Sequence, residues 1–153
     1  MENKRVCIIG WLIIISNLII IWGLIPGLPG SFYVISLPMW ALRLLNALGV
    51  VLAMSRKIVI DENIFIAYHL LLSFVPMILA VGLIKLNGIS RKILITICGV
   101  NLLYWLWAPL ALGIKFGFAG NFSRGLIDYG LAVVASLTYL FYLTDPRMRK
   151  LFK

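Results

Sequence analysis

The chain has 153 residues, of which 63% are hydrophobic and only 12% are charged, with a formal net charge of +9. A typical soluble domain is about half apolar and about a quarter charged, so this composition argues against a soluble protein. A basic chain could bind nucleic acid, but no basic segment here has the length or the interleaved aromatic residues of a nucleic-acid module. Because domains of about 100 to 150 residues are the commonest, we expect one domain over residues 1–153.

Four uninterrupted apolar runs dominate the chain. They cover residues 6–25, 64–84, 93–114 and 126–143. Runs of about 18 or more apolar residues are typical of transmembrane helices. The first run follows basic residues, as in a signal peptide, but it is too long for one and no small-residue cleavage site follows it. The sequence therefore predicts an all-α polytopic membrane four-helix bundle with an uncleaved first helix.

A fifth apolar stretch, residues 32–54, decides the predicted topology. If it crosses the membrane, six Lys and Arg residues lie on the side of the N-terminus and seven on the other. If it does not cross, nine lie on the side of both termini and five on the other. The nine are Lys4, Arg5, Lys85, Arg91, Lys92, Arg147, Arg149, Lys150 and Lys153. The positive-inside rule favours the second arrangement, with both termini cytoplasmic and basic clusters against anionic lipid headgroups.

The residues of this fifth stretch favour the same arrangement. Pro38 interrupts it, and Arg43 lies in its middle, where a charge facing lipid is costly. Arg43, Asn46 and Lys57 fall on one face at helical spacing. This pattern predicts an amphipathic helix in the interface, or against the outer side of the bundle, with its polar stripe toward water. A fifth crossing with Arg43 paired internally is the alternative.

Turn and breaker residues separate the predicted helices. Residues 26–30 read Pro-Gly-Leu-Pro-Gly and end the first helix. Residues 85–92 predict a tight cytoplasmic hairpin, and Asp145-Pro146 ends the last long helix.

Two stretches resemble a group of small four-pass prokaryotic membrane proteins of unassigned function. Residues 80–92, AVGLIKLNGISRK, are similar to the "GLLKLKxWARK" hairpin of that group, with Ile89 and Ser90 in place of its Trp and Ala. Residues 142–152, YLTDPRMRKLF, are similar to its closing "YLxxPxVKxxF". The resemblance implies a four-pass architecture in a prokaryotic cytoplasmic (inner) membrane, and it implies no activity.

Ionisable side chains within the predicted spans are few, and such residues are often functional. His69 and Asp128 lie near the outer ends of their helices and, with Arg124 and Tyr129, could form an outer polar cluster. The structural alternative is an Arg124–Asp128 pair at a helix start, with His69 bonded to Ser73 or to a headgroup.

Four small or amide side chains are predicted to pack helices together. Asn17 and Asn101 lie at matching depths, where side-chain amides usually hydrogen-bond across helices. Ala132 and Ser136 form a small-x-x-x-small pair that allows close backbone approach.

Motifs of catalysis and cofactor binding are missing from the sequence. There is no Gly-rich phosphate loop, nucleophile elbow or zinc-protease motif, and Cys7 and Cys98 have no neighbouring His that could complete a zinc site. We therefore expect no catalytic residue, cofactor or metal, and we interpret the chain as a non-enzymatic accessory or scaffold protein in a larger membrane complex or homo-oligomer. The alternatives are a small transport or channel component that acts as an oligomer, and an enzyme acting on lipid-linked substrate at the outer face.

Overall fold

A computed structural model describes residues 2–25, 38–52, 62–116 and 118–152; the side chains of residues 2–3, 62–66, 68, 112, 115–116 and 118–128 fall outside this description. All regular structure in these ranges is helical, which confirms the all-α class. The helices are α1 (Glu2–Leu24), α3 (Met39–Leu48), α4 (Glu62–Ile84), α5 (Gly88–Phe116), α6 (Phe118–Thr144) and the short α7 (Pro146–Arg149).

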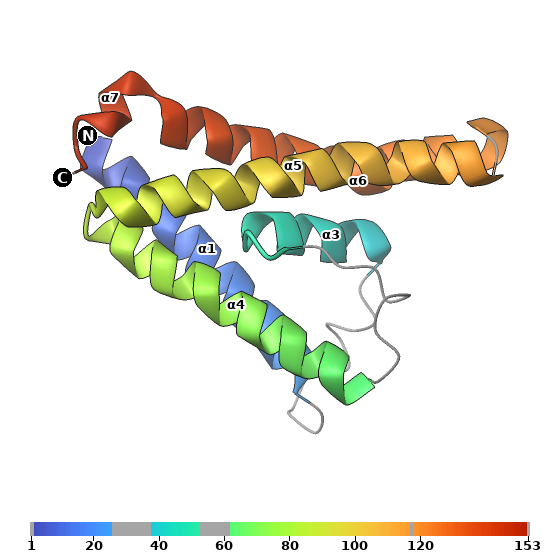
Figure 1. Cartoon of the computed structure of the whole chain (residues 1–153), viewed down its shortest axis with the longest axis horizontal. Helices are drawn as coiled ribbons and strands as arrows, with labels where there is room; N and C mark the ends of the chain where they lie inside the picture. The colour runs from blue at the N-terminus through green and yellow to red at the C-terminus, as the bar shows by residue number, and fades with distance from the viewer. Residues whose placement is uncertain (1, 26–37, 53–61, 117, 153) are drawn as a thin grey trace.

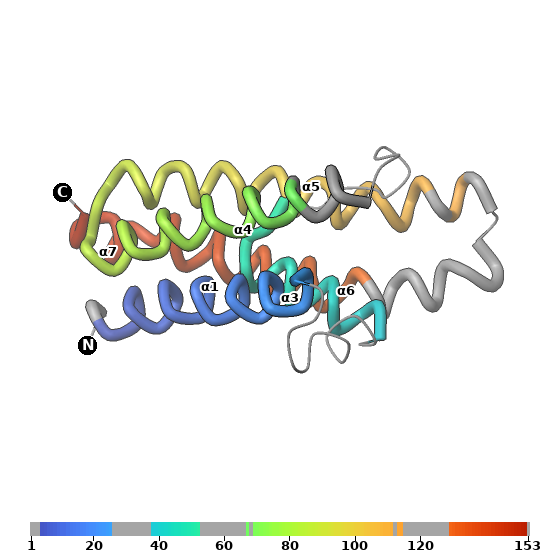
Figure 2. The backbone as a smooth tube through the Cα atoms, turned by 90° about the horizontal axis from the view of Figure 1, so that it is seen from below, coloured from blue at the N-terminus to red at the C-terminus, as the bar shows by residue number. Residues whose placement is uncertain are grey.

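The four long helices form two antiparallel pairs. α1 packs chiefly against α4, and α5 packs against α6. The pairs meet at the end of the molecule that holds both termini, and they diverge toward the other end (Figure 1). Seen from below, α4 and α5 lie in one layer and α1, α3 and α6 in the other (Figure 2). We call the end with the termini the closed end and the space between the diverging pairs the wedge.

The helix α3 lies in the wedge and contacts both pairs, through α6 and α1. Its first residues, Met39 and Trp40, are exposed, whereas Ala47, Val50 and Val51 at its other end are buried. α3 therefore points inward from the open side. Of the two predicted placements, in the interface or against the bundle, the packing of α3 on α6 and α1 corresponds to the second. Arg43 of the predicted polar stripe, however, packs on a tyrosine of α6. Residues 32–37 and 53–54 of the predicted segment 32–54 lie outside the described residues.

Two helices begin well before the apolar runs that predicted them. α5 starts at Gly88 rather than at residue 93. Asn87 caps it by accepting hydrogen bonds from the backbone N–H groups of Ile89 at 2.8 Å and Ser90 at 3.3 Å, and such a cap satisfies N–H groups that the first turn leaves free. α6 starts at Phe118 rather than at residue 126, since helices continue through polar residues that no apolar run marks. At the other end of α6, Asp145 and Pro146 separate it from α7 as predicted.

The closed end is held by an apolar core that all the long helices share. Val6 of α1, Leu83 of α4, Leu94 of α5 and Leu143 of α6 belong to one buried cluster, together with Met148 of α7. Gly10 lets α1 approach α4, since a Cβ there would fall 2.5 Å from Ile84 Cγ1 and 3.2 Å from the Ala80 carbonyl oxygen. The buried cluster joins the two helix pairs at the closed end.

The outward faces of the long helices are strongly apolar. Large side chains such as Ile78 (70% exposed) and Phe141 (76% exposed) point away from the packed interior. Two helical stretches in the described residues, Lys4–Leu24 and Gly88–Ala111, are long and apolar enough to cross a membrane by length and composition alone. A soluble monomer rarely exposes a contiguous apolar surface of such extent, so these faces favour association with a membrane.

Candidate functional site

The inner end of α3 is a helix terminus buried inside the bundle. The Val51 N–H donates to the Asn46 carbonyl at 3.0 Å and the Val50 N–H to the Ala47 carbonyl at 3.2 Å. These two bonds define a Schellman motif, with Val50 at the position that normally takes glycine. Val50 has a φ of 57°. This value is rare for a β-branched residue and costs about 1 to 2 kcal/mol, so tertiary contacts stabilise this turn against its local preference.

Two side chains from different helices supply those contacts. The Asn17 amide of α1 donates to the Gly49 carbonyl at 2.6 Å, and the Tyr139 hydroxyl of α6 donates to the Leu48 carbonyl at 2.9 Å. The last carbonyls of a helix have no partner within the helix, so each bond satisfies a group that would otherwise be buried without one. α3 is thereby joined to both helix pairs at one point.

Gly49 makes the contact with α1 possible. Its own φ of −75° is an ordinary helical value, so no turn requires glycine at this position. A Cβ there would lie only 3.2 Å from Asn17 Nδ2 and 3.3 Å from Ile20 Cδ1. The glycine therefore serves the close approach of the α3 backbone to α1.

Each long helix carries a polar side chain that is at most 2% exposed, and we call these four side chains the polar layer. On α5, Asn101 lies between Cys98 and Trp105, which belong to two separate apolar clusters; on α6, Ser136 lies between Tyr139 and Ala132 of the same two clusters. The two clusters also contain Val50 and Ala47 of α3, respectively. The polar layer comprises Asn17, Asn101, Ser73 and Ser136, all at most 2% exposed.

The four predicted packing residues are all buried. Asn17 donates to the Gly49 carbonyl directly after α3, and to the Ile13 carbonyl of its own helix at 2.8 Å. Within the described part of the chain, Asn101 Oδ1 is buried without a hydrogen bond, as are Asn17 Oδ1 and Ser73 Oγ. Ala132 is fully buried in the cluster that includes Ala47 of α3.

Of the four residues of the predicted outer polar cluster, only Tyr129 and His69 have described side chains. Tyr129 is buried, and the Arg43 guanidinium of α3 lies 3.8 Å from its ring centroid. This distance suits a cation–π interaction. The Trp105 ring centroid lies 5.9 Å from that of Tyr129. His69 is half-buried on α4, and the side chains of Arg124 and Asp128 lie outside the described residues. The sequence analysis considered an internal partner for Arg43 only together with a fifth crossing, and it did not identify Tyr129 as that partner.

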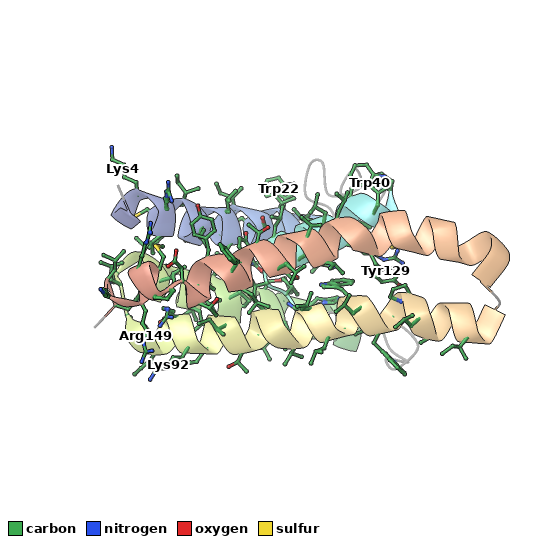
Figure 3. The ribbon with its side chains drawn as sticks, turned by 90° about the horizontal axis from the view of Figure 1, so that it is seen from above. Lys4, Trp22, Trp40, Lys92, Tyr129 and Arg149 are labelled. Atoms are coloured by element: carbon green, nitrogen blue, oxygen red, sulfur yellow. The ribbon has the colours of Figure 1, made fainter. Side chains whose placement is uncertain are left out.

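Basic residues gather at the closed end, where Lys4, Lys92 and Arg149 mark the ends of three helices (Figure 3). Arg91 is buried there. Its Nε donates to the Leu143 carbonyl at 2.7 Å, and its guanidinium lies 5.5 Å from the centroid of the Phe152 ring. This bond joins α5 to the end of α6.

Within the described side chains, no group of three or more His, Cys, Asp or Glu residues could hold a metal ion. The polar groups at the inner end of α3 are instead the Asn17 amide, the Tyr139 hydroxyl and the carbonyl oxygens of Leu48 and Gly49. No protein-family model matches the chain, and no curated protein or solved structure shows significant similarity to it.

Proposed function

We propose that the chain is a multi-pass protein of a prokaryotic cytoplasmic membrane and acts as a non-enzymatic accessory or scaffold subunit. In this proposal α1, α4, α5 and α6 cross the bilayer, and α3 enters it from the outer side and returns. The apolar outward faces of the long helices, combined with a buried polar layer inside, carry the proposal. An apolar outside and a polar interior reverse the pattern of a soluble protein. This arrangement suits a hydrocarbon solvent, because amides and hydroxyls find hydrogen-bond partners only inside the bundle.

The direction of insertion follows from the charges. Eight of the nine basic residues on the side of the termini, all except Lys153, are among the described residues. Both termini and the turn between α4 and α5 share the closed end (Figure 1). Because Lys and Arg concentrate on cytoplasmic ends, the closed end faces the cytoplasm and its cations meet anionic headgroups.

Labelling of single cysteines in whole cells tests this topology. In a background with Cys7→Ser and Cys98→Ser, an impermeant maleimide should label Asn121→Cys and should not label Asn87→Cys. Permeabilised cells should label both, which controls for reactivity. Labelling of Asn87→Cys alone would contradict the proposed orientation.

Co-purification of partner proteins tests the scaffold role. Extraction in mild detergent should recover it in a stable complex larger than its own mass of 17.2 kDa, either with other membrane proteins or with copies of itself. Replacing exposed apolar residues on one helix face at a time should locate the contact. A strictly monomeric protein with no co-purifying partner would oppose this role.

A small transport or channel component is the second candidate, and α3 favours it. A non-helical turn at membrane depth is tolerated where protein buries it or where it lines a polar path. The turn at Gly49–Leu52 is such a segment. Flux of a solute through vesicles that contain the purified protein would support this candidate over the scaffold.

A further inference from the structure

Three buried side-chain oxygen atoms on α1, α4 and α5 have no hydrogen-bond partner among the described residues. They are Asn17 Oδ1, Asn101 Oδ1 and Ser73 Oγ, on side chains that are at most 1% exposed. Leaving a buried polar atom unpaired costs about 1 to 3 kcal/mol, so native proteins rarely do so without a ligand or water. These three atoms therefore point to an occupant.

Helix register places two of the three atoms at one level. Gly10 of α1 lies against Ala80 and Ile84 of the antiparallel α4. Asn17 lies about two turns beyond Gly10 on α1, and Ser73 lies about two turns before Ala80 on α4, so the two side chains come to about the same height. Asn17 also contacts Gly49 directly.

Asn101 belongs to the other helix pair. Its neighbours on the same face of α5, Cys98 and Trp105, share apolar clusters with Val50 and Ala47. Asn101 therefore lies on the buried face of α5, which contributes to both clusters in which the α3 segment takes part. The Trp105 indole N–H, one turn away, also lacks a partner among the described residues, but an N–H cannot coordinate a cation.

The groups gathered at this level are electron-pair donors. The carbonyl oxygens of Leu48 and Gly49 each accept one hydrogen bond and keep a second lone pair. They lie at the C-terminus of α3, where the aligned peptide dipoles leave a partial negative charge. A ligand here must therefore be positively charged or rich in hydrogen-bond donors.

We propose that the inner end of α3 binds a desolvated hard monovalent cation, with Na⁺ as the reference ion. Neutral side-chain oxygens and freed carbonyls at a half-helix C-terminus are the ligands that such ions take inside membrane proteins. A divalent ion would call for carboxylates, and the described groups around α3 include none. The inference rests on the proposed membrane location and deepens the transport candidate.

Thermal unfolding of the purified full chain in mild detergent tests the proposal. At constant ionic strength, NaCl or KCl should raise Tm relative to choline chloride, in a saturable way and by about 5 to 10 °C at a hundred times Kd. Equal Tm in all three salts would overturn the proposal and leave water as the occupant of the layer.

Variants of Asn101 test whether its side-chain oxygen is a ligand of the ion. Asn101→Leu should lose the cation-dependent rise in Tm, whereas Asn101→Asp should bind the cation at least about tenfold more tightly, since a carboxylate replaces a neutral oxygen. Thr96→Val, which removes an exposed hydroxyl of the same helix, is the matched control and should keep the full rise.

If Asn101→Leu fails to fold, Ser73→Ala and Asn101→Asp still decide the question. A full cation-dependent rise in Ser73→Ala, together with no gain in affinity in Asn101→Asp, would overturn the assignment. Failure of these tests is distinct from failure of the topology, because cysteine labelling at positions 87 and 121 does not depend on a bound ion.

Discussion

The closed end and the wedge are stabilised in different ways. At the closed end, residues of α1, α4, α5, α6 and α7 share one apolar core, and Arg91 joins α5 to α6. In the wedge, α3 is held by two hydrogen bonds to its last carbonyls and by a smaller cluster with α5 and α6. Dispersed apolar packing resists single changes better than a few polar contacts do, so the wedge is the part of the fold that is easier to rearrange.

One backbone motif occurs in both regions and makes the contrast sharper. α4 ends at the closed end in a Schellman motif with Leu86 at a φ of 59°, and α3 ends in the wedge in the same motif with Val50 at 57°. Leu86 is half-buried beside a polar hairpin, whereas Val50 is 1% exposed. The same local strain is therefore balanced by different surroundings.

The largest effect is expected where α1 crosses α4. Gly10→Leu should destabilise the protein by about 3 kcal/mol, because its side chain would overlap Ile84 and the Ala80 backbone. Denaturant unfolding in detergent measures the loss. Gly99→Leu is the control, since a Cβ there meets nothing within 4 Å. It should change stability by at most about 1 kcal/mol, and equal losses in the two variants would show that the crossing is not tightly packed.

Replacing the buried Arg91 at the closed end should have the next largest effect on stability. Arg91→Met deletes a charged hydrogen bond and leaves the Leu143 carbonyl without its donor. Such a loss should cost about 2 kcal/mol. Lys92→Met changes an exposed neighbour and should be close to neutral. The free energies of unfolding of both variants are measured at one detergent concentration. Similar values for Arg91→Met and Lys92→Met would show that the Arg91 hydrogen bond does not stabilise the closed end.

Removing either hydrogen bond to the inner end of α3 should have a smaller effect on stability. Asn17→Leu and Tyr139→Phe should each cost about 1 kcal/mol, and the double variant should depart from the sum because both bonds fix one helix end. A cysteine at the buried position Val51, in the background without native cysteines, reports the state of α3. Its maleimide labelling should speed up in each variant, and an unchanged rate would mean that apolar packing alone holds α3.

The smallest effects compare the two strained turns. Leu86→Gly should be neutral or stabilise by up to about 1 kcal/mol, because glycine relieves a positive φ at a half-buried site. Val50→Gly gains the same relief but loses a buried side chain, for a net cost of about 1 kcal/mol. Stabilisation by both changes would show that Val50 contributes little packing.

Local sequence determined much of the helical framework. Apolar runs marked the four long helices, and Asn87 and Asp145-Pro146 marked their breaks. Alternating helix directions brought both termini and the turn between α4 and α5, which carry most of the basic residues, to one end. These features depend on residues close together in the chain, where propensity, capping and apolarity act directly. The small and amide residues of the interior, Asn17 and Ala132 among them, were also recognisable as packing positions.

Only the tertiary structure decided where α3 goes and what its polar residues meet. Its amphipathic pattern suited a helix flat on the membrane as well as one inside a wedge, because the sequence does not show which surface its faces will contact. The bonds from Asn17 to Gly49 and from Tyr139 to Leu48 join residues far apart in the chain, as does the Arg43 contact with Tyr129. Such contacts arise from the divergence of two helix pairs, which depends on the apolar core that they share at the closed end rather than on the pattern of α3 itself.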